Sequence, residues 1–254
     1  YYDFKESINK IPPHRILALN RGEKEDVLRI KAEVDDERAV EMIYNFYEFD
    51  NRKKSSFEHL INAVDYAYKR LIFPSLEREV RNHLSEKAET KAVNNFSTNL
   101  KSLLMQPPLE DKRVLAVDPA FRTGCKLAAL TENGSLLETG AIYPHSPVNK
   151  KEEAAKRIAE LVKNYNIDLI VIGNGTASRE TESFVAELIK EGMDVEYTIV
   201  SEAGASVYSA SKIARKEFPD LDVSIRGAIS IGRRIQDPLA ELVKIDPKSL
   251  GVGM

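Results

Sequence analysis

The sequence predicts an α/β domain that is preceded by a mainly α-helical region with a short β-hairpin. Before residue 106, hydrophobic residues recur every three to four positions, as they do on helices that bury one face. Two prolines, Pro107 and Pro108, then interrupt the chain. Beyond them, short apolar runs alternate with helical patterns, and this alternation is typical of a layered α/β domain.

Residues 1–111 are predicted to form the helical scaffold region. Apolar and polar residues alternate over residues 28–34, a period of two that favours a strand, so residues 15–34 are predicted to form the hairpin. The helical pattern near residues 75–105 continues to the two prolines without a breaker, which predicts one long helix. Apolar positions recur along this whole helix, so it needs a packing partner along its length.

Residues 112–247 are predicted to form the α/β domain, and residues 248–254 to begin a following module. The runs at residues 113–118, 168–173 and 195–200 have the continuous hydrophobic character of strands that a parallel sheet buries on both faces. The other predicted elements are strands at residues 125–130 and 136–142 and helices at residues 152–165, 178–190, 205–217 and 228–243.

The composition excludes several classes of protein. Hydrophobic residues make up 43% of the 254 residues and charged residues 30%, which is enough for a packed core and a polar surface. The single cysteine, Cys125, excludes an internal disulfide and a Cys-based zinc site, and it fits a reducing, cytoplasmic location. No apolar run approaches the length of a membrane-spanning helix. The net charge of −3 argues against a strongly basic nucleic-acid binder, but it leaves room for a local basic face.

Three acidic residues are candidates for catalysis and for holding Mg²⁺ or Mn²⁺. Asp118 ends the first predicted strand of the α/β domain, Glu202 follows the last strand, and Asp237 lies in the final predicted helix. The carboxyl ends of parallel strands form the usual crevice of an α/β sheet. Clustered carboxylates bind hard cations, and two such ions can stabilise a phosphodiester displacement. The alternative is that each acid is a surface or capping residue.

Six further residues are candidates for binding nucleic acid: Arg122, Thr123, Asn174, Arg179, Arg233 and Arg234. The first two lie in a turn between strands, and the next two lie in a small-residue loop that opens a helix, where an anion can bind. The last pair lies in the final predicted helix. The alternatives are a plain hairpin turn, a helix cap and a solvated salt-bridge surface, respectively.

Several segments resemble known families. Residues 117–124 (VDPAFRTG) are similar to the opening strand and turn of RuvC and YqgF domains, which have an RNase H-like fold. More specific segments resemble the Tex family and extend over most of the chain: residues 14–23 (HRILALNRGE), 172–182 (IGNGTASRETE), 201–211 (SEAGASVYSAS) and 233–249 (RRIQDPLAELVKIDPKS).

The resemblance implies a cytoplasmic protein that binds nucleic acid and is associated with transcription. It also implies that the chain is an internal piece of a longer protein, whose other modules carry most of the nucleic-acid binding. Asp118, Glu202 and Asp237 match the three acids of the YqgF pattern. RuvC enzymes differ in placing further acids where this sequence has Asn174 and Arg234, which implies a degenerate site.

Three functional hypotheses follow. The first is a non-catalytic scaffold that binds single-stranded RNA or DNA in transcription. The second is a nuclease or resolvase that uses Mg²⁺ or Mn²⁺ held by the three acids. The third is an interaction platform for the transcription machinery, for which the long helix would serve as a spine.

Overall fold

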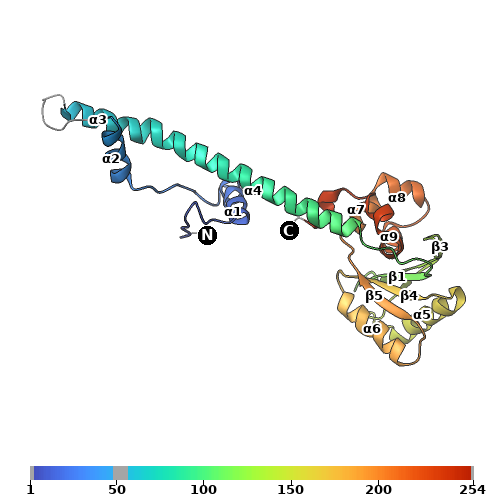
Figure 1. Cartoon of the computed structure of the whole chain (residues 1–254). Helices are drawn as coiled ribbons and strands as arrows, with labels where there is room; N and C mark the ends of the chain where they lie inside the picture. The colour runs from blue at the N-terminus through green and yellow to red at the C-terminus, as the bar shows by residue number, and fades with distance from the viewer. Residues whose placement is uncertain (1–2, 48–56, 253–254) are drawn as a thin grey trace. The chain divides into compact units, whose positions relative to one another are not determined.

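The computed structural model describes residues 3–47 and 57–252, with the backbone alone for Phe57. The chain divides into two compact units, Tyr1–Asn95 and Phe96–Met254 (Figure 1). Within residues 3–47 and 57–252, none of the helices has both the length and the apolar character that crossing a membrane requires.

Helices are the regular elements of the first unit. They are α1 (Pro13–Lys24), α2 (Asp36–Phe46), α3 (Phe57–Ala67), a short π-helical turn (Tyr68–Ile72) and the first part of α4 (Phe73–Leu104). The long helix predicted near residues 75–105 is confirmed by α4. Its last turns belong to the second unit, where Leu100, Leu103 and Leu104 pack against a buried cluster around Tyr208.

The predicted hairpin at residues 15–34 is wrong. Its first half lies in α1. This helix begins with Pro13 in the first turn, where an amide N–H would have no partner within the helix. Residues 28–34 form neither a helix nor a strand, although half-buried and exposed side chains alternate along residues 28–33 as they do in a strand. Because α1 takes the place of the first strand, this extended segment has no strand beside it in the part of the chain that the structure describes.

The first unit buries few of its hydrophobic side chains. In the part of this unit that the structure describes, the buried ones are Ile16, Val64, Tyr68 and Ala88. α1 is tied to α4 by polar contacts instead, since Asn20 donates a hydrogen bond to the Ser85 hydroxyl at 2.8 Å.

The second unit is built on a five-stranded sheet with the order β3-β2-β1-β4-β5. The strands are β1 (Val114–Asp118), β2 (Cys125–Leu130), β3 (Leu136–Ile142), β4 (Leu169–Gly173) and β5 (Glu196–Val200). β1, β2 and β3 form an antiparallel meander, whereas β4 and β5 run parallel to β1. All five predicted strands are present. Their arrangement is the one expected of an RNase H-like domain, and it confirms that prediction of the fold class.

Helices cover both faces of the sheet (Figure 1). α5 (Lys151–Tyr165) and α6 (Ser178–Lys190) bury Ile158, Leu161, Phe184 and Val185 against one face. On the other face, Ala228 and Ile229 of α9 (Val223–Gln236) pack against β1 and β2. The remaining helices of this unit are α7 (Ala205–Ala210), α8 (Lys212–Glu217), α10 (Pro238–Leu242) and a 3-10 turn (Pro247–Ser249).

Two of the predicted helices are each divided in two. The predicted helix at residues 205–217 is interrupted by Ser211, which has an extended backbone and whose side chain caps α8. The predicted helix at residues 228–243 is interrupted at Asp237, because Pro238 has no amide N–H to continue α9 and instead begins α10.

Candidate functional site

The carboxyl ends of β1, β4 and β5 lie side by side at one edge of the sheet. Asp118 is the last residue of β1, Gly173 is the last residue of β4, and Glu202 follows β5 after one further residue. This is the edge at which open α/β sheets place their binding crevices. The sequence therefore predicted correctly that Asp118 and Glu202 lie at one edge of the sheet.

Asp118 is a half-buried carboxyl group. Burial, followed by the negative charge of Glu202, raises the pKa of Asp118 to about 6, while the nearby Lys126 ammonium acts in the opposite direction. Lys126 lies directly across from Asp118 in the β1–β2 ladder. The influence of Glu202 on this pKa means that the negative charge of Glu202 reaches Asp118 and disfavours its ionised form.

A loop of small residues encloses Glu202. A Cβ atom on Gly175 would lie 1.5 Å from Glu202 Oε1, and one on Gly173 would lie 2.6 Å from Glu202 Oε2, so neither position has room for a side chain. The Asn174 side chain accepts a hydrogen bond from the Glu202 amide at 3.1 Å. Burial raises the pKa of Glu202, against the opposing effects of the Gly175 amide and of Arg234. The Asn174 oxygen, predicted to contact nucleic acid, thus positions the acid.

Arg234 is buried beside the loop that carries Glu202, and 5% of its surface is exposed. Its Nη1 donates to the carbonyl oxygens of Ser201 at 2.6 Å and Ala203 at 2.8 Å. Burial lowers the pKa of Arg234, while the charges of Glu241 and Glu202 act in the opposite direction. Arg234 therefore fixes the loop that carries Glu202 and supplies a cation behind it, and its guanidinium does not face solvent.

Arg233 also makes internal contacts. Its Nε donates to the Gly134 carbonyl oxygen at 2.8 Å, and its Nη1 lies 3.2 Å from a Glu217 carboxylate oxygen. Its guanidinium lies 4.9 Å from the centre of the Phe218 ring. Neither arginine of this predicted pair is therefore free to meet a phosphate without first breaking these contacts.

Asp237 does not join the other two acids, and the predicted three-acid site is wrong on this point. Asp237 is exposed at the end of α9, where its Oδ1 accepts a hydrogen bond from the Ala240 amide at 2.9 Å and caps α10. Gly227 of α9 lies beside Asp118, since an added Cβ atom there would be 3.4 Å from Asp118 Oδ2. Ten residues separate Gly227 from Asp237, or about 15 Å along a helix.

Gly227 was missed by the sequence reasoning. The available signal was a glycine inside an otherwise helical pattern, which costs about 1 kcal/mol relative to alanine and often marks a close packing position. The motif comparison assigned the helical acid to Asp237, although Pro238 directly after it predicts a bend, and α9 does end there.

A catalytic metal centre does not fit these side chains. RuvC-like folds imply divalent ions, but no group of three His, Cys, Asp or Glu side chains within residues 3–47 and 57–252 is placed to hold one. Asp118 and Glu202 are two donors, Gly227 contributes none, and Arg234 already neutralises part of the negative charge. Two metal ions need several anionic ligands between them.

Exposed polar side chains remain around this acid pair. Arg122 and Thr123 are exposed in the turn between β1 and β2, and Arg179 is exposed in the first turn of α6, which follows β4. For the Arg122 and Arg179 guanidinium groups, the described part of the chain shows no hydrogen bond or ion pair. β1 and β4 are neighbours, so both arginines lie at the edge of the sheet that carries Asp118.

His145 and Cys125 are buried, and both contact the Thr181 hydroxyl. His145 Nε2 lies 2.8 Å from Thr181 Oγ1, which lies 3.7 Å from Cys125 Sγ. Burial lowers the pKa of His145, and it raises the pKa of the Cys125 thiol. A buried thiol with a raised pKa is a poor nucleophile, so this group does not constitute a catalytic pair.

The comparisons with known proteins match this organisation. The family described as Tex protein YqgF-like domain matches residues 112–236, and the family described as Tex central region-like matches residues 1–96. A Thermus thermophilus RuvC structure is 16% identical, with a TM-score of 0.35, over 47% of this chain and 90% of that chain.

Two curated relatives align with the whole chain. The Bacillus subtilis protein YdcI is 53% identical over 100% of this chain and 35% of its own length. The Neisseria gonorrhoeae protein named transcriptional accessory protein Tex is 45% identical over 100% of this chain and 34% of its own length. The chain thus spans about a third of the length of these relatives. With one Tex family description matching each of its two parts, the chain belongs to the Tex family.

Proposed function

We propose that this chain is a cytoplasmic nucleic-acid-binding scaffold that acts in transcription and that its RNase H-like unit binds single-stranded RNA or DNA without cleaving it. The observation that carries the proposal is the contrast at the edge of the sheet. The acid pair is enclosed and lacks a third acid, whereas Arg122 and Arg179 are exposed and unpaired in the described structure.

The electrostatics of the site favour a phosphate contact at its rim. Free guanidinium groups form charge-assisted hydrogen bonds with phosphate oxygens, and the Thr123 hydroxyl can add a neutral one. Arg234 offsets the charge of Glu202 from behind, so the carboxylates repel an approaching phosphate less than two isolated acids would. The rim therefore supports binding, while the incomplete acid set supports the absence of hydrolysis.

The role in transcription rests on the name of the relative from Neisseria gonorrhoeae. Because the chain spans about a third of such relatives, the other parts of a longer protein would supply further contacts with nucleic acid and with the transcription machinery. The RNase H-like unit would then serve as one contact among several.

The test is a binding measurement on the whole chain with labelled single-stranded RNA and DNA at low salt. Wild type is compared with an Arg122→Ala/Arg179→Ala double variant and with Arg215→Ala, which removes an exposed arginine elsewhere in the same unit. The double variant should bind about tenfold more weakly. Its affinity should also fall less steeply with salt concentration, by the slope expected for the loss of about two phosphate contacts. Arg215→Ala should bind like wild type.

Binding should be the same in EDTA and in Mn²⁺. Equal binding by the double variant and wild type would contradict the assigned surface. Cleavage of either strand in Mn²⁺ that disappears in Asp118→Asn would contradict the non-catalytic proposal and establish a nuclease.

A further inference from the structure

The segment at residues 28–34 of the first unit is an extended stretch of chain that pairs with no strand within residues 3–47 and 57–252. It connects α1 to α2, and Leu28, Ile30 and Ala32 are half-buried while Arg29, Lys31 and Glu33 are exposed. This alternation is the pattern of a strand with one face packed against its own domain and the other toward solvent.

One edge of this segment already has hydrogen-bond partners. The Ala32 amide donates to Glu77 Oε1 at 2.8 Å. The Glu23 carboxyl has a lowered pKa, mainly because of a hydrogen bond from Arg81 and in smaller part because of the Ile30 amide. Amides two residues apart in an extended chain point to the same edge, so Glu23 and Glu77 together occupy the edge formed by Ile30 and Ala32.

The opposite edge is free. The amides and carbonyls of Arg29, Lys31 and Glu33 have no hydrogen-bond partner among the residues that the structure describes. An unpaired edge of extended backbone is a template on which another strand can pair. Peptides that bind in this way gain affinity from main-chain hydrogen bonds and specificity from alternate side chains.

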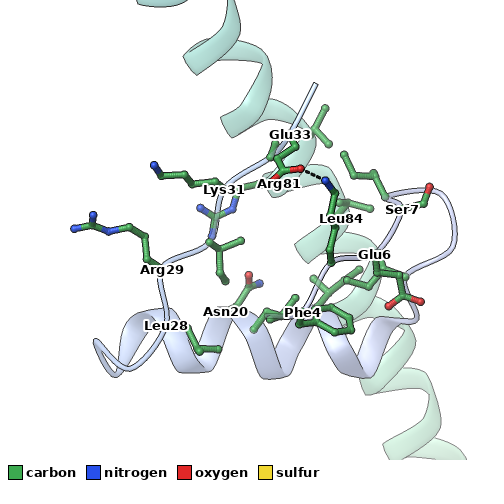
Figure 2. A pocket seen from close by; sticks show the side chains of 18 of the residues that line it. Phe4, Glu6, Ser7, Asn20, Leu28, Arg29, Lys31, Glu33, Arg81 and Leu84 are labelled. Carbon is green, nitrogen blue, oxygen red and sulfur yellow. Dashed lines mark hydrogen bonds and ion pairs between the residues drawn. The ribbon is translucent and has the colours of Figure 1, made fainter. Parts of the chain in front are cut away.

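A hollow of about 960 Å³ lies beside the segment (Figure 2). Its lining includes apolar side chains from three places: Phe4 and Ile8 near the start of the chain, Leu19 of α1, and Val80 and Leu84 of α4. Ile8 is 42% exposed and Val80 is 37% exposed, so these side chains still have surface to bury. Alternate side chains of an added strand would enter this hollow.

The charges beside the free edge specify the chemistry of the partner. Arg29 and Lys31 are exposed and lie at the border of the hollow (Figure 2). In the described structure, neither side chain has a hydrogen bond or an ion pair, whereas Glu33 is paired with Lys5. Opposite charges directly across a pair of strands stabilise the pairing by about 0.2–1 kcal/mol.

We propose that residues 28–34 form a docking edge for an extended segment of a separate protein partner, in which acidic and apolar residues alternate. Its backbone pairs with Arg29, Lys31 and Glu33. Its acidic side chains lie opposite Arg29 and Lys31, and its apolar side chains enter the hollow. This site is independent of the proposed nucleic-acid contact in the second unit.

The test uses the whole chain and a short labelled peptide in which valine and glutamate alternate. Two control peptides contain the same residues in shuffled order and lysine in place of glutamate. Lys31→Pro removes the central amide of the free edge, and proline fits an extended backbone, so the contacts of Ile30 and Ala32 are kept. Lys31→Gln removes the charge but keeps the amide. Circular dichroism and thermal unfolding confirm that both variants fold.

Wild type should bind the alternating acidic peptide and bind both control peptides at least about tenfold more weakly. Lys31→Gln should weaken this binding about threefold, as expected from the loss of one cross-strand charge pair. Lys31→Pro should weaken it at least about tenfold, because the backbone pairing is interrupted. An Arg29→Glu/Lys31→Glu double variant should instead prefer the peptide with lysine.

The proposal is overturned if wild type does not bind the acidic peptide, if the shuffled peptide binds equally well, or if Lys31→Pro and Lys31→Gln have the same effect. Loss of single-stranded RNA binding in both Lys31 variants, without any peptide binding by wild type, would identify the segment as a nucleic-acid surface and likewise reject the proposal.

Discussion

The two units use similar sequence patterns with different results. In the second unit, the apolar runs of β1 and β4 pair with each other and bury their side chains under helices on both faces. The third run becomes β5, which pairs with β4 at the edge of the sheet and stays largely exposed. In the first unit, the alternating residues 28–34 are extended but pair with no strand among the described residues, and several hydrophobic side chains around them remain partly exposed. Apolar patterning therefore predicts local conformation well, but it does not say whether the partner lies in the same chain.

The same contrast holds for charged residues. Arg234 of the second unit is held by the backbone carbonyl oxygens of Ser201 and Ala203, and its charge acts on Glu202. Arg29 and Lys31 of the first unit have no partner in the described structure. Arg234 should consequently matter for stability, whereas Arg29 and Lys31 should matter mainly for binding.

Substitution of the buried arginine should have the largest effect. Arg234→Met keeps the volume but leaves the Ser201 and Ala203 carbonyls unpaired and Glu202 without its cation, so it should destabilise the second unit by about 3 kcal/mol or more. Arg29→Met, in the first unit, should change stability by less than about 0.5 kcal/mol. Chemical denaturation measures both, and a small effect of Arg234→Met would mean that this guanidinium does not support the Glu202 loop.

Substitution of a glycine beside Glu202 should have the next largest effect. Gly175→Ala would place a Cβ atom 1.5 Å from Glu202 Oε1, so the enclosed carboxylate must move, at a cost of about 2–3 kcal/mol. Gly22→Ala in the first unit meets Leu28 Cδ1 at 2.6 Å, but that side chain borders the hollow and can yield, so the change should be nearly neutral.

The Gly175→Ala prediction has an internal control. In the Gly175→Ala/Glu202→Ala double variant the clash is gone, so the two effects should not add. Additive losses in a denaturation series would show that the loop and the carboxylate are not in contact.

Neutralising Asp118 should stabilise the chain, with a dependence on pH. Its pKa is raised from 3.8 to about 6, so the folded state holds the proton more tightly, and stability falls as pH rises through this window. Asp118→Asn removes the cost of burying the ionised carboxylate. The free energy of unfolding should therefore rise by about 1–3 kcal/mol above pH 6, since each pKa unit corresponds to about 1.4 kcal/mol. The gain should vanish below about pH 4.

Glu23 in the first unit should behave in the opposite way. Arg81 lowers the pKa of Glu23, so its charged form stabilises the fold, and this contribution is lost as the pH falls through the lowered value. Glu23→Gln should therefore destabilise at neutral pH. Thermal unfolding across a pH series measures the stability of the Asp118→Asn and Glu23→Gln variants. If both variants changed stability in the same direction, the environments assigned to these two carboxyls would be contradicted.

Much of the second unit could be predicted from the sequence, because its strands carry continuous apolar runs and the carboxyl ends of parallel strands must meet. Asp118 and Glu202 were located by that rule. The burial of Arg234 could not be predicted, since its partners are the backbone carbonyls of Ser201 and Ala203, which every sequence has. The prediction of a hairpin was wrong because the alternation over residues 28–34 indicates an extended chain but does not indicate what lies beside it.

We propose that Asp118 and Glu202 of the second unit do not form a catalytic metal site, because the described residues supply no third carboxylate beside them. The most direct test of this claim is thermal unfolding of the whole chain during a titration with Mn²⁺, for wild type and Asp118→Asn, because an ion that binds only the folded state must raise the melting temperature. The melting temperature of wild type should not rise up to millimolar Mn²⁺. A rise in wild type that is absent in Asp118→Asn would contradict the claim and establish a functioning metal site.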